Sequence, residues 1–177
     1  MNLSSYPRIA VIGCPGAGKS TLARQIAAAS AEDAEDVGHP LIHLDYEHWG
    51  PGFVAMPRGE FIAKQQEWVQ GERWIIDGNY KGTMEIRFAA ADLVICLDLP
   101  RLLCAWRVIK RQGKQRPDMR PDVKAPGLFS EGFAAFFGFV WGFRKNAMPK
   151  ILALREKYPD VEFMRIKTKR EYKSLLN

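Results

Sequence analysis

The chain has 177 residues, of which 47% are hydrophobic and 26% charged, and its formal net charge is +6. These values are typical of one globular domain with a full hydrophobic core. The three cysteines, Cys14, Cys96 and Cys104, form no C-x-x-C pair, which argues against a disulfide framework or a zinc site. The most apolar stretch, residues 132–143, has 12 residues and is too short to span a bilayer.

The N-terminal residues 1–7 have neither the basic start nor the apolar segment of a signal peptide. We therefore expect a single domain over residues 1–177 with no membrane partner. Because the cysteines indicate no disulfides, we expect a reducing, cytoplasmic compartment.

The charge is unevenly distributed along the chain. Residues 1–100 hold 8 Lys or Arg against 13 Asp or Glu, residues 101–143 hold 8 against 3, and residues 144–177 hold 10 against 4. A basic second half is compatible with a nucleic-acid partner, and equally with a site that holds a polyphosphate. The charge alone does not separate these two classes of ligand.

The first predicted elements are a strand, a glycine-rich loop and a helix. Residues 8–12 are short, apolar and β-branched, which predicts a buried parallel strand. Residues 19–29 are rich in helix formers with an apolar stripe. Between them, Gly13–Ser20 fits the phosphate-loop pattern G-x-x-x-x-G-K-[ST] at every fixed position. A glycine-rich turn with a chance lysine is the alternative, but this strand–loop–helix context favours a nucleoside triphosphate site.

The loop residues have distinct roles in such a site. Backbone N–H groups and the helix N-terminus bind phosphate oxygens, Lys19 reaches the β- and γ-phosphates, and the Ser20 hydroxyl ligates Mg²⁺. We therefore predict ATP and Mg²⁺ as cofactors. The predicted ATP-binding residues are Gly13, Pro15, Gly16, Ala17, Gly18, Lys19, Ser20 and Thr21.

Apolar runs predict four further strands, at residues 41–44, 74–77, 93–97 and 162–166, and helices at about 58–70, 100–112, 130–157 and 169–176. This alternation predicts an α/β fold of three layers, with a five-stranded parallel sheet covered on both faces. Residues 46–57 are expected to form a loop, within an acceptor-side insert at about 46–73. The basic, proline-punctuated residues 113–127 predict a short lid.

Three acidic residues end predicted strands, where the carboxyl edge of a parallel sheet faces the ligand. Asp77 is a candidate magnesium ligand, acting through a water, or the start of the turn formed with Gly78 and Asn79. Asp45 could be a helix cap, but residues 46–51 do not resemble a helix start. It is therefore a candidate general base toward an acceptor hydroxyl or a second carboxylate near the metal. Asp98 is expected to cap the next helix.

Several arginines follow in the basic half. Arg107 and Arg111 lie four residues apart on one face of a predicted helix, just before the lid, and Arg144 lies in the next helix. Guanidinium groups stabilise the charge of a phosphoryl group in transfer, and a lid can bring them to it. A solvated run of charges is the alternative. His43 and His48 are not assigned a role, because no further ligand completes a metal set around them.

The sequence resembles adenylate kinases in its phosphate loop and in Asp77-Gly78. Over residues 8–167 it is more similar to the adenylate-kinase-like proteins often labelled topology modulation protein. The residues that carry this resemblance are His43-Leu44-Asp45, Trp49, Pro57-Arg58, residues 74–80, residues 97–101 and Trp106-Arg107.

The resemblance implies a P-loop kinase fold with a short lid. It places the nucleotide between the phosphate loop, the arginines and the loop near Lys167 and Thr168. It also implies that Arg58 and Arg87 face the acceptor, beside Asp45, Asp77 and Gly78. Unlike adenylate kinases, the chain has Asn79-Tyr80 in place of Phe-Pro, and residues 46–73 lack their nucleoside-monophosphate signature.

These features favour an ATP-dependent kinase, a transferase that phosphorylates a nucleotide, nucleoside or similar small molecule. One alternative is a nucleic-acid-binding protein with a regulatory nucleotide site, as the label topology modulation implies, although no DNA-reading element is recognisable. Another is a nucleotide-binding switch without phosphoryl transfer. Lid arginines that point away from the phosphate loop would favour nucleic acid.

Overall fold

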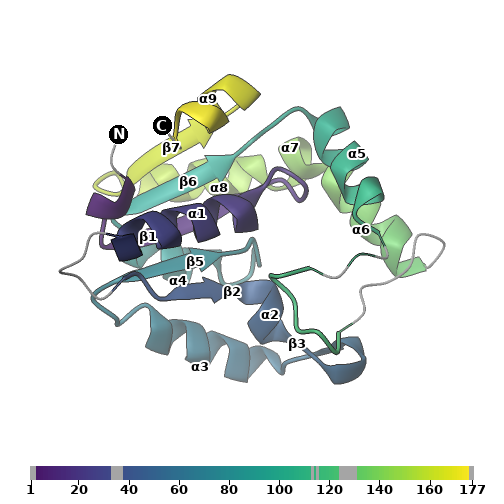
Figure 1. Cartoon of the computed structure of the whole chain (residues 1–177), viewed down its shortest axis with the longest axis horizontal. Helices are drawn as coiled ribbons and strands as arrows, with labels where there is room; N and C mark the ends of the chain where they lie inside the picture. Colours follow the sequence, from purple (N-terminus) through teal and green to yellow (C-terminus); the bar gives the residue numbers. More distant parts are fainter. Residues whose placement is uncertain (1–2, 33–37, 113, 115, 124–130, 176–177) are drawn as a thin grey trace.

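A computed structural model describes residues 3–32, 38–112, 114, 116–123 and 131–175. Its main sheet has five parallel strands in the order β2-β5-β1-β6-β7 (Figure 1). The strands are β1 (Arg8–Gly13), β2 (Leu41–His43), β5 (Trp74–Asp77), β6 (Leu93–Leu97) and β7 (Glu162–Ile166). The sequence-based prediction of an α/β fold with a five-stranded parallel sheet is confirmed.

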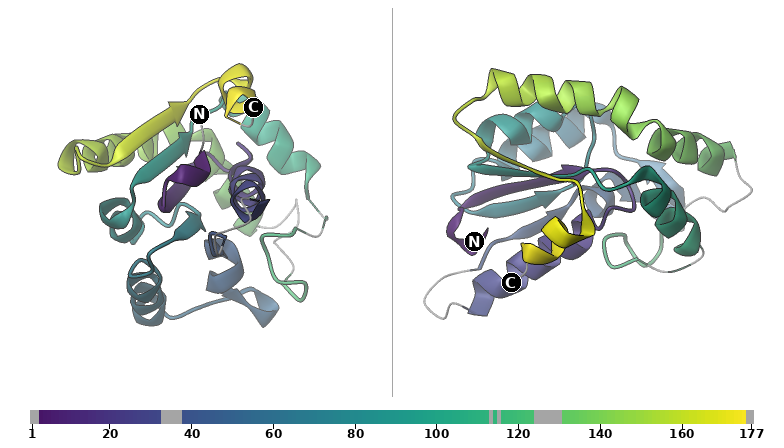
Figure 2. Two further views of the ribbon diagram at one scale, coloured as in Figure 1. Left: turned by 60° about the vertical axis from the view of Figure 1, so that its left-hand side comes forward. Right: turned by 90° about the horizontal axis from the view of Figure 1, so that it is seen from above.

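Helices cover both faces of the sheet (Figure 2). One face carries α1 and α9, and the other carries α4 and α8. The helices are α1 (Lys19–Glu32), α2 (Leu44–His48), α3 (Arg58–Trp68), α4 (Met84–Ala90), α5 (Arg101–Lys110), α6 (Glu131–Trp141), α7 (Phe143–Asn146), α8 (Met148–Lys157) and α9 (Lys169–Ser174). A short 3-10 helix, η1 (Leu3–Ser5), precedes β1.

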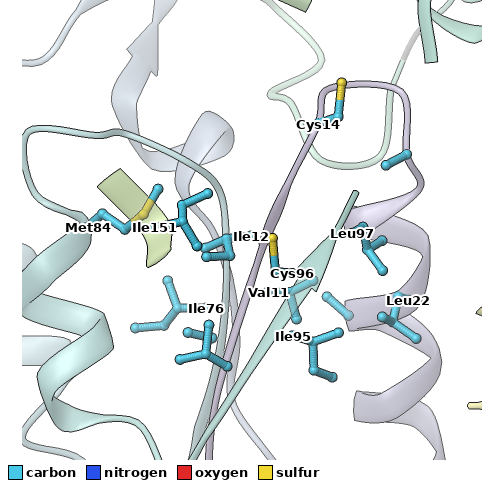
Figure 3. Packing of buried hydrophobic residues seen from close by; sticks show 14 of the residues in the cluster. Val11, Ile12, Cys14, Leu22, Ile76, Met84, Ile95, Cys96, Leu97 and Ile151 are labelled. Atoms are coloured by element: carbon cyan, nitrogen blue, oxygen red, sulfur yellow. The ribbon is translucent and has the colours of Figure 1, made fainter. Parts of the chain in front are cut away.

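The core lies on both sides of β1 and β6, whose central residues are fully buried (Figure 3). Successive side chains of a strand point to opposite faces of the sheet. On one face Ile12 of β1 lies toward Ile151, and on the other face Leu97 of β6 lies toward Leu22 of α1. Burial on both faces explains why these strands are almost entirely apolar. The three cysteines are free and buried.

Two local expectations are wrong, and one helix was not predicted. Residues 46–57 are not a plain loop: α2 occupies Leu44–His48, and a small hairpin follows with β3 (Trp49–Gly50), η2 (Pro51–Phe53) and β4 (Val54–Ala55). Helix α4 was not predicted, because it has only seven residues and short helices carry little periodic signal.

The expected helix over 130–157 is divided into α6, α7 and α8. Gly142 precedes α7, and Pro149 lies in the first turn of α8, where its missing N–H costs least. Residue 130 and the expected lid residues 113, 115 and 124–127 lie outside the described residues. Within the described part of the chain, no helix is long and apolar enough to cross a membrane.

Gly13 joins the end of β1 to the loop that follows, and its backbone passes very close to β6. Its φ is +134°, and a Cβ added there would lie 2.3 Å from the carbonyl oxygen of Leu97. Only glycine accommodates both the conformation and the approach. The contact is secured by a hydrogen bond from the Cys14 N–H to the Leu97 carbonyl, 2.9 Å long.

We expect Gly13→Ala to lower the free energy of unfolding by about 3 kcal/mol or more, because backbone strain adds to a clash with the backbone of β6. Gly52→Ala is the matched control. Gly52 also has a positive φ, +72°, but a Cβ there would meet nothing closer than 3.9 Å, so the loss should be about 1 kcal/mol. Chemical denaturation measures both, and equal losses would contradict the importance of the close approach.

Candidate functional site

The phosphate loop lies at the carboxyl end of β1 and leads into α1 (Figure 1). The Ala17 N–H donates to the Cys14 carbonyl at 3.0 Å, and Gly16 and Gly18 have positive φ. The Lys19 ammonium donates to the Cys14 carbonyl at 3.4 Å. Lys19 therefore lies over the loop, whose backbone N–H groups are expected to donate hydrogen bonds to phosphate.

A side chain that the sequence analysis did not assign holds this loop in place. Asn79 accepts from the Gly13 N–H at 3.0 Å and donates to the Gly13 carbonyl at 2.8 Å. The Gly78 N–H donates to the Val11 carbonyl at 3.1 Å. The Asp77-Gly78-Asn79 turn therefore fastens the end of β5 to the start of the phosphate loop.

Asp77 at the end of β5 is paired with His43 at the end of β2. The His43 Nδ1 and Asp77 Oδ2 atoms are 3.0 Å apart, and both side chains are largely buried. The neighbouring strands place these two residues opposite each other in register. The other carboxylate oxygen, Oδ1 of Asp77, is buried without a hydrogen-bond partner among the described residues. A buried unpaired carboxylate oxygen is costly unless a ligand satisfies it.

Asp45 lies in the first turn of α2, contrary to the expectation that no helix starts there. Its two oxygens accept from the Tyr80 hydroxyl at 2.9 Å and from the Arg116 guanidinium at 3.2 Å. Burial and the Asp45 charge raise the pKa of Tyr80, which keeps its hydroxyl protonated as a donor. Tyr80 has a positive φ of +34°, a strained conformation of the kind that gathers at functional sites.

Aromatic rings form a wall beside Asp45. His48 lies 4.6–4.8 Å from the rings of Trp49, Phe61 and Tyr80, measured between centroids. Trp49 stacks on Phe53 at 3.9 Å. Burial lowers the pKa of His48, so the ring belongs to this apolar wall as a neutral side chain.

The described residues 116–123 of the expected lid contact α2 and Ser20 of the phosphate loop. Asp118 accepts from the Ser20 hydroxyl at 2.8 Å. Arg116 forms a short ion pair with Asp118 and also binds Asp45. Arg120 donates to the Tyr46 carbonyl at 3.1 Å. The sequence analysis identified the basic residues of this segment but did not single out Asp118, which follows Arg116-Pro117.

The arginines of α5 also face the loop. Arg107 lies 3.3 Å from the carbonyl oxygens of both Gly16 and Ala17. Burial, together with the smaller effect of the neighbouring Arg116 charge, lowers the pKa of Arg111 to about 10. Arg107 thus contacts the phosphate loop directly, and Arg116 is linked to it through Asp118. Arg111 lies near the charges of Arg116, Asp118 and Asp45.

Arg144 does not join this group in the described contacts. Its guanidinium binds Asp98, with a distance of 2.8 Å between Nε and Oδ1. Arg165 of β7 binds the other oxygen of Asp98 at 2.7 Å. Asp98 makes these ion pairs instead of capping α5, whose N-cap residue is Pro100.

Arg87 also differs from expectation. Its side chain is only 1% exposed and donates to the carbonyls of Gly78 and Asn79, at 3.3 and 2.9 Å, and to Gln65. Arg87 therefore supports the 78–80 turn from the interior and does not face an open acceptor site. Arg58 is exposed at the start of α3.

The last loop, which was expected to lie beside the nucleotide, joins β7 to α9. Lys167 is exposed, and the Thr168 hydroxyl caps α9 by accepting from the Glu171 N–H at 3.1 Å. Tyr172 of α9 donates to the Gly18 carbonyl at 3.3 Å. The end of β7 and α9 thus reach the phosphate loop from the face that α1 covers.

The donor atoms near the loop fit magnesium. Within the described ranges, no group of three or more His, Cys, Asp or Glu residues could hold a metal by itself. Mg²⁺ is commonly held by one or two carboxylates together with phosphate oxygens and waters. The Ser20 hydroxyl and the unpaired Asp77 oxygen are hard oxygen donors of this kind.

No protein-family model matches the chain, and the comparison with curated proteins gave no match. Among solved structures, the chain is similar to shikimate kinase from Acinetobacter baumannii in complex with shikimate, at 17% identity and a TM-score of 0.58, over 97% of this chain and 92% of that one. It is also similar to a gluconokinase from Sinorhizobium meliloti 1021, at 16% identity and a TM-score of 0.50, over 96% and 90%. These similarities show that the chain shares the α/β fold of these two proteins.

The Asp98 cluster yields a prediction about stability. Its carboxylate is only 2% exposed, whereas the side chains of Arg144 and Arg165 are 52% and 32% exposed. Replacing both arginines by Met leaves a buried unpaired charge, and we expect a loss of about 3–5 kcal/mol. Asp98→Asn leaves two arginines that can reach water, so its loss should be smaller, about 1–2 kcal/mol. Urea denaturation measures both, and the reverse order would contradict this assignment.

Proposed function

We propose that the protein is a kinase that transfers a phosphoryl group from ATP to a small molecule, with magnesium. The observation that carries this proposal is the convergence of Lys19, Arg107 and the lid residues Arg116 and Asp118 on one phosphate loop. Phosphoryl transfer requires positioning and charge stabilisation more than covalent chemistry. The Lys19 and Arg107 cations beside the backbone N–H groups of the loop supply both.

The residues divide into a donor side and an acceptor side. On the donor side, the phosphate loop and Lys19 bind the triphosphate, while Arg107 and Arg111 stabilise charge on the transferred group. Ser20 and Asp77 are the residues that would hold magnesium, which when bound offsets phosphate charge. On the acceptor side, Asp45 accepts a hydrogen bond from the acceptor hydroxyl and receives its proton as the phosphoryl group is transferred.

The acceptor side combines polar groups with an apolar face. Asp45 and Arg58 supply polar groups, and the aromatic wall around His48 supplies an apolar face. Such a combination suits a nucleotide, a nucleoside or a similarly sized hydroxyl compound. The names of the two structural neighbours, shikimate kinase and gluconokinase, support a small-molecule acceptor. A screen of hydroxyl compounds coupled to ADP release tests this directly.

Binding to nucleic acid is not supported. That function would need the lid arginines free on the surface, whereas Arg116 pairs with two carboxylates and Arg107 contacts the loop. The resemblance to proteins labelled topology modulation protein rests on the sequence motifs alone.

We expect Lys19→Ala to weaken ATP binding by about 2–3 kcal/mol while leaving stability nearly unchanged, because it removes a charge-assisted phosphate contact and no core packing. Isothermal calorimetry measures the affinity, and the unfolding transition measures stability. Lys150→Ala, on the exposed face of α8, is the control and should bind ATP like the parent. Unchanged ATP affinity in a folded Lys19→Ala protein would contradict the nucleotide site.

We expect ATP with Mg²⁺ to slow hydrogen exchange over residues 107–127, because a polyphosphate favours the closed arrangement that the arginines can grip. Replacing Arg107 or Arg111 should lower turnover more than stability. Hydrogen exchange followed by mass spectrometry makes the comparison, with duplex DNA in place of nucleotide as the control. Protection by DNA that falls steeply with salt, and none by nucleotide, would show a nucleic-acid binder instead.

A further inference from the structure

Asp118 connects the lid to the phosphate loop through the residue expected to bind magnesium. Its Oδ2 atom lies 2.8 Å from the Ser20 hydroxyl oxygen, and the residue is only 6% exposed. The same carboxylate forms an ion pair with Arg116. The segment 116–123 therefore brings a carboxylate that is paired with a guanidinium into direct contact with Ser20.

The hydrogen bond has a direction that leaves Ser20 available to a cation. A serine hydroxyl has one proton and two lone pairs, and the Ser20 hydroxyl donates its hydrogen bond to the Asp118 carboxylate. The Ser20 proton is therefore engaged with Asp118, and the lone pairs remain for another partner. A metal ligand whose proton is held by a second residue is oriented and made more electron-rich by that residue.

Arg116 extends this contact to the acceptor side. Its guanidinium binds Asp118 and Asp45, which belong to the lid and to α2. Because Arg116 binds both carboxylates, the segment that places Asp118 against Ser20 also contacts Asp45 on the acceptor side. Asp77 is not part of this series of contacts, because its hydrogen-bonded oxygen, Oδ2, contacts His43.

We propose that Asp118 is a positioning residue for magnesium. It accepts the hydrogen bond that the Ser20 hydroxyl donates, directs the hydroxyl lone pairs toward the metal and adds a negative charge beside it. This inference rests on the proposed function of the same site. It has a thermodynamic consequence. Because Asp118 reaches Ser20 only when residues 116–123 lie over the loop, magnesium binding and lid closure must strengthen each other by the same factor.

The test is a magnesium titration of ATP binding to the full chain, followed by calorimetry and repeated in EDTA. We expect Asp118→Asn to raise the magnesium concentration at half-saturation about 10–100-fold, the loss typical when a residue behind a metal ligand is removed. Affinity for ATP in EDTA should stay within about twofold of the parent. The control is Asp122→Asn, which removes the same charge from an exposed position in the same segment and should leave the titration unchanged.

A second arm tests whether Asp118 acts through Ser20. In a Ser20→Ala background, Asp118→Asn should have little further effect on the magnesium titration, because the two changes remove one interaction. Additive effects would show that Asp118 acts independently and would overturn the proposal. If Asp118→Asn does not give the parent's unfolding transition, Asp118→Ser replaces it in both arms.

The remaining outcomes are also decisive. An Asp118→Asn titration that overlays Asp122→Asn would limit Asp118 to holding Ser20 in the nucleotide-free protein. Tighter binding of ATP with magnesium by Asp118→Asn would mean that the carboxylate competes with the ligand. Either result overturns this inference but leaves the kinase proposal intact. A parent chain that binds no ATP with or without magnesium would overturn both.

Discussion

The approach of β1 to β6 at Gly13 is the constraint on which the rest of the site depends. A side chain at this position would collide with the Leu97 carbonyl, so the two strands can come together only around a glycine. The Cys14 N–H donates to the Leu97 carbonyl of β6, and Asn79, just after β5, holds Gly13 from the other side. Three neighbouring strands, β5, β1 and β6, therefore define the position of the phosphate loop.

Charge placement follows from this arrangement. Parallel strands bring Asp45, Asp77 and Asp98 to one edge of the sheet, but each carboxylate has a different set of partners. Asp98 is paired with two arginines, Asp77 with His43, and Asp45 with Tyr80 and a lid arginine. Three residues that look alike in the sequence are thus separated into one carboxylate held by two structural ion pairs and two carboxylates near the candidate reaction centre.

The basic half of the chain divides in the same way. Arg107 contacts the phosphate loop and Arg116 is linked to it through Asp118, whereas Arg144 and Arg165 neutralise a buried carboxylate. This division explains why net charge did not separate a polyphosphate ligand from nucleic acid. What matters for a triphosphate is which guanidinium groups converge on one point, and convergence is a property of the folded chain.

The sequence by itself determined the order of the strands along the chain, the parallel sheet and the position of the phosphate loop, because these depend on local patterns: apolar runs, glycine spacing and the residues that flank them. It did not determine α2 or α4, since short helices are stabilised by tertiary packing more than by their own periodicity. Only the tertiary structure placed Arg87 inside, paired Arg144 with Asp98, and seated Asp118 on Ser20. Residues 20 and 118 are far apart in sequence, and no local pattern specifies which distant side chains will satisfy a buried charge or a hydroxyl. That choice is made when the layers pack, because every buried polar group must then find a partner.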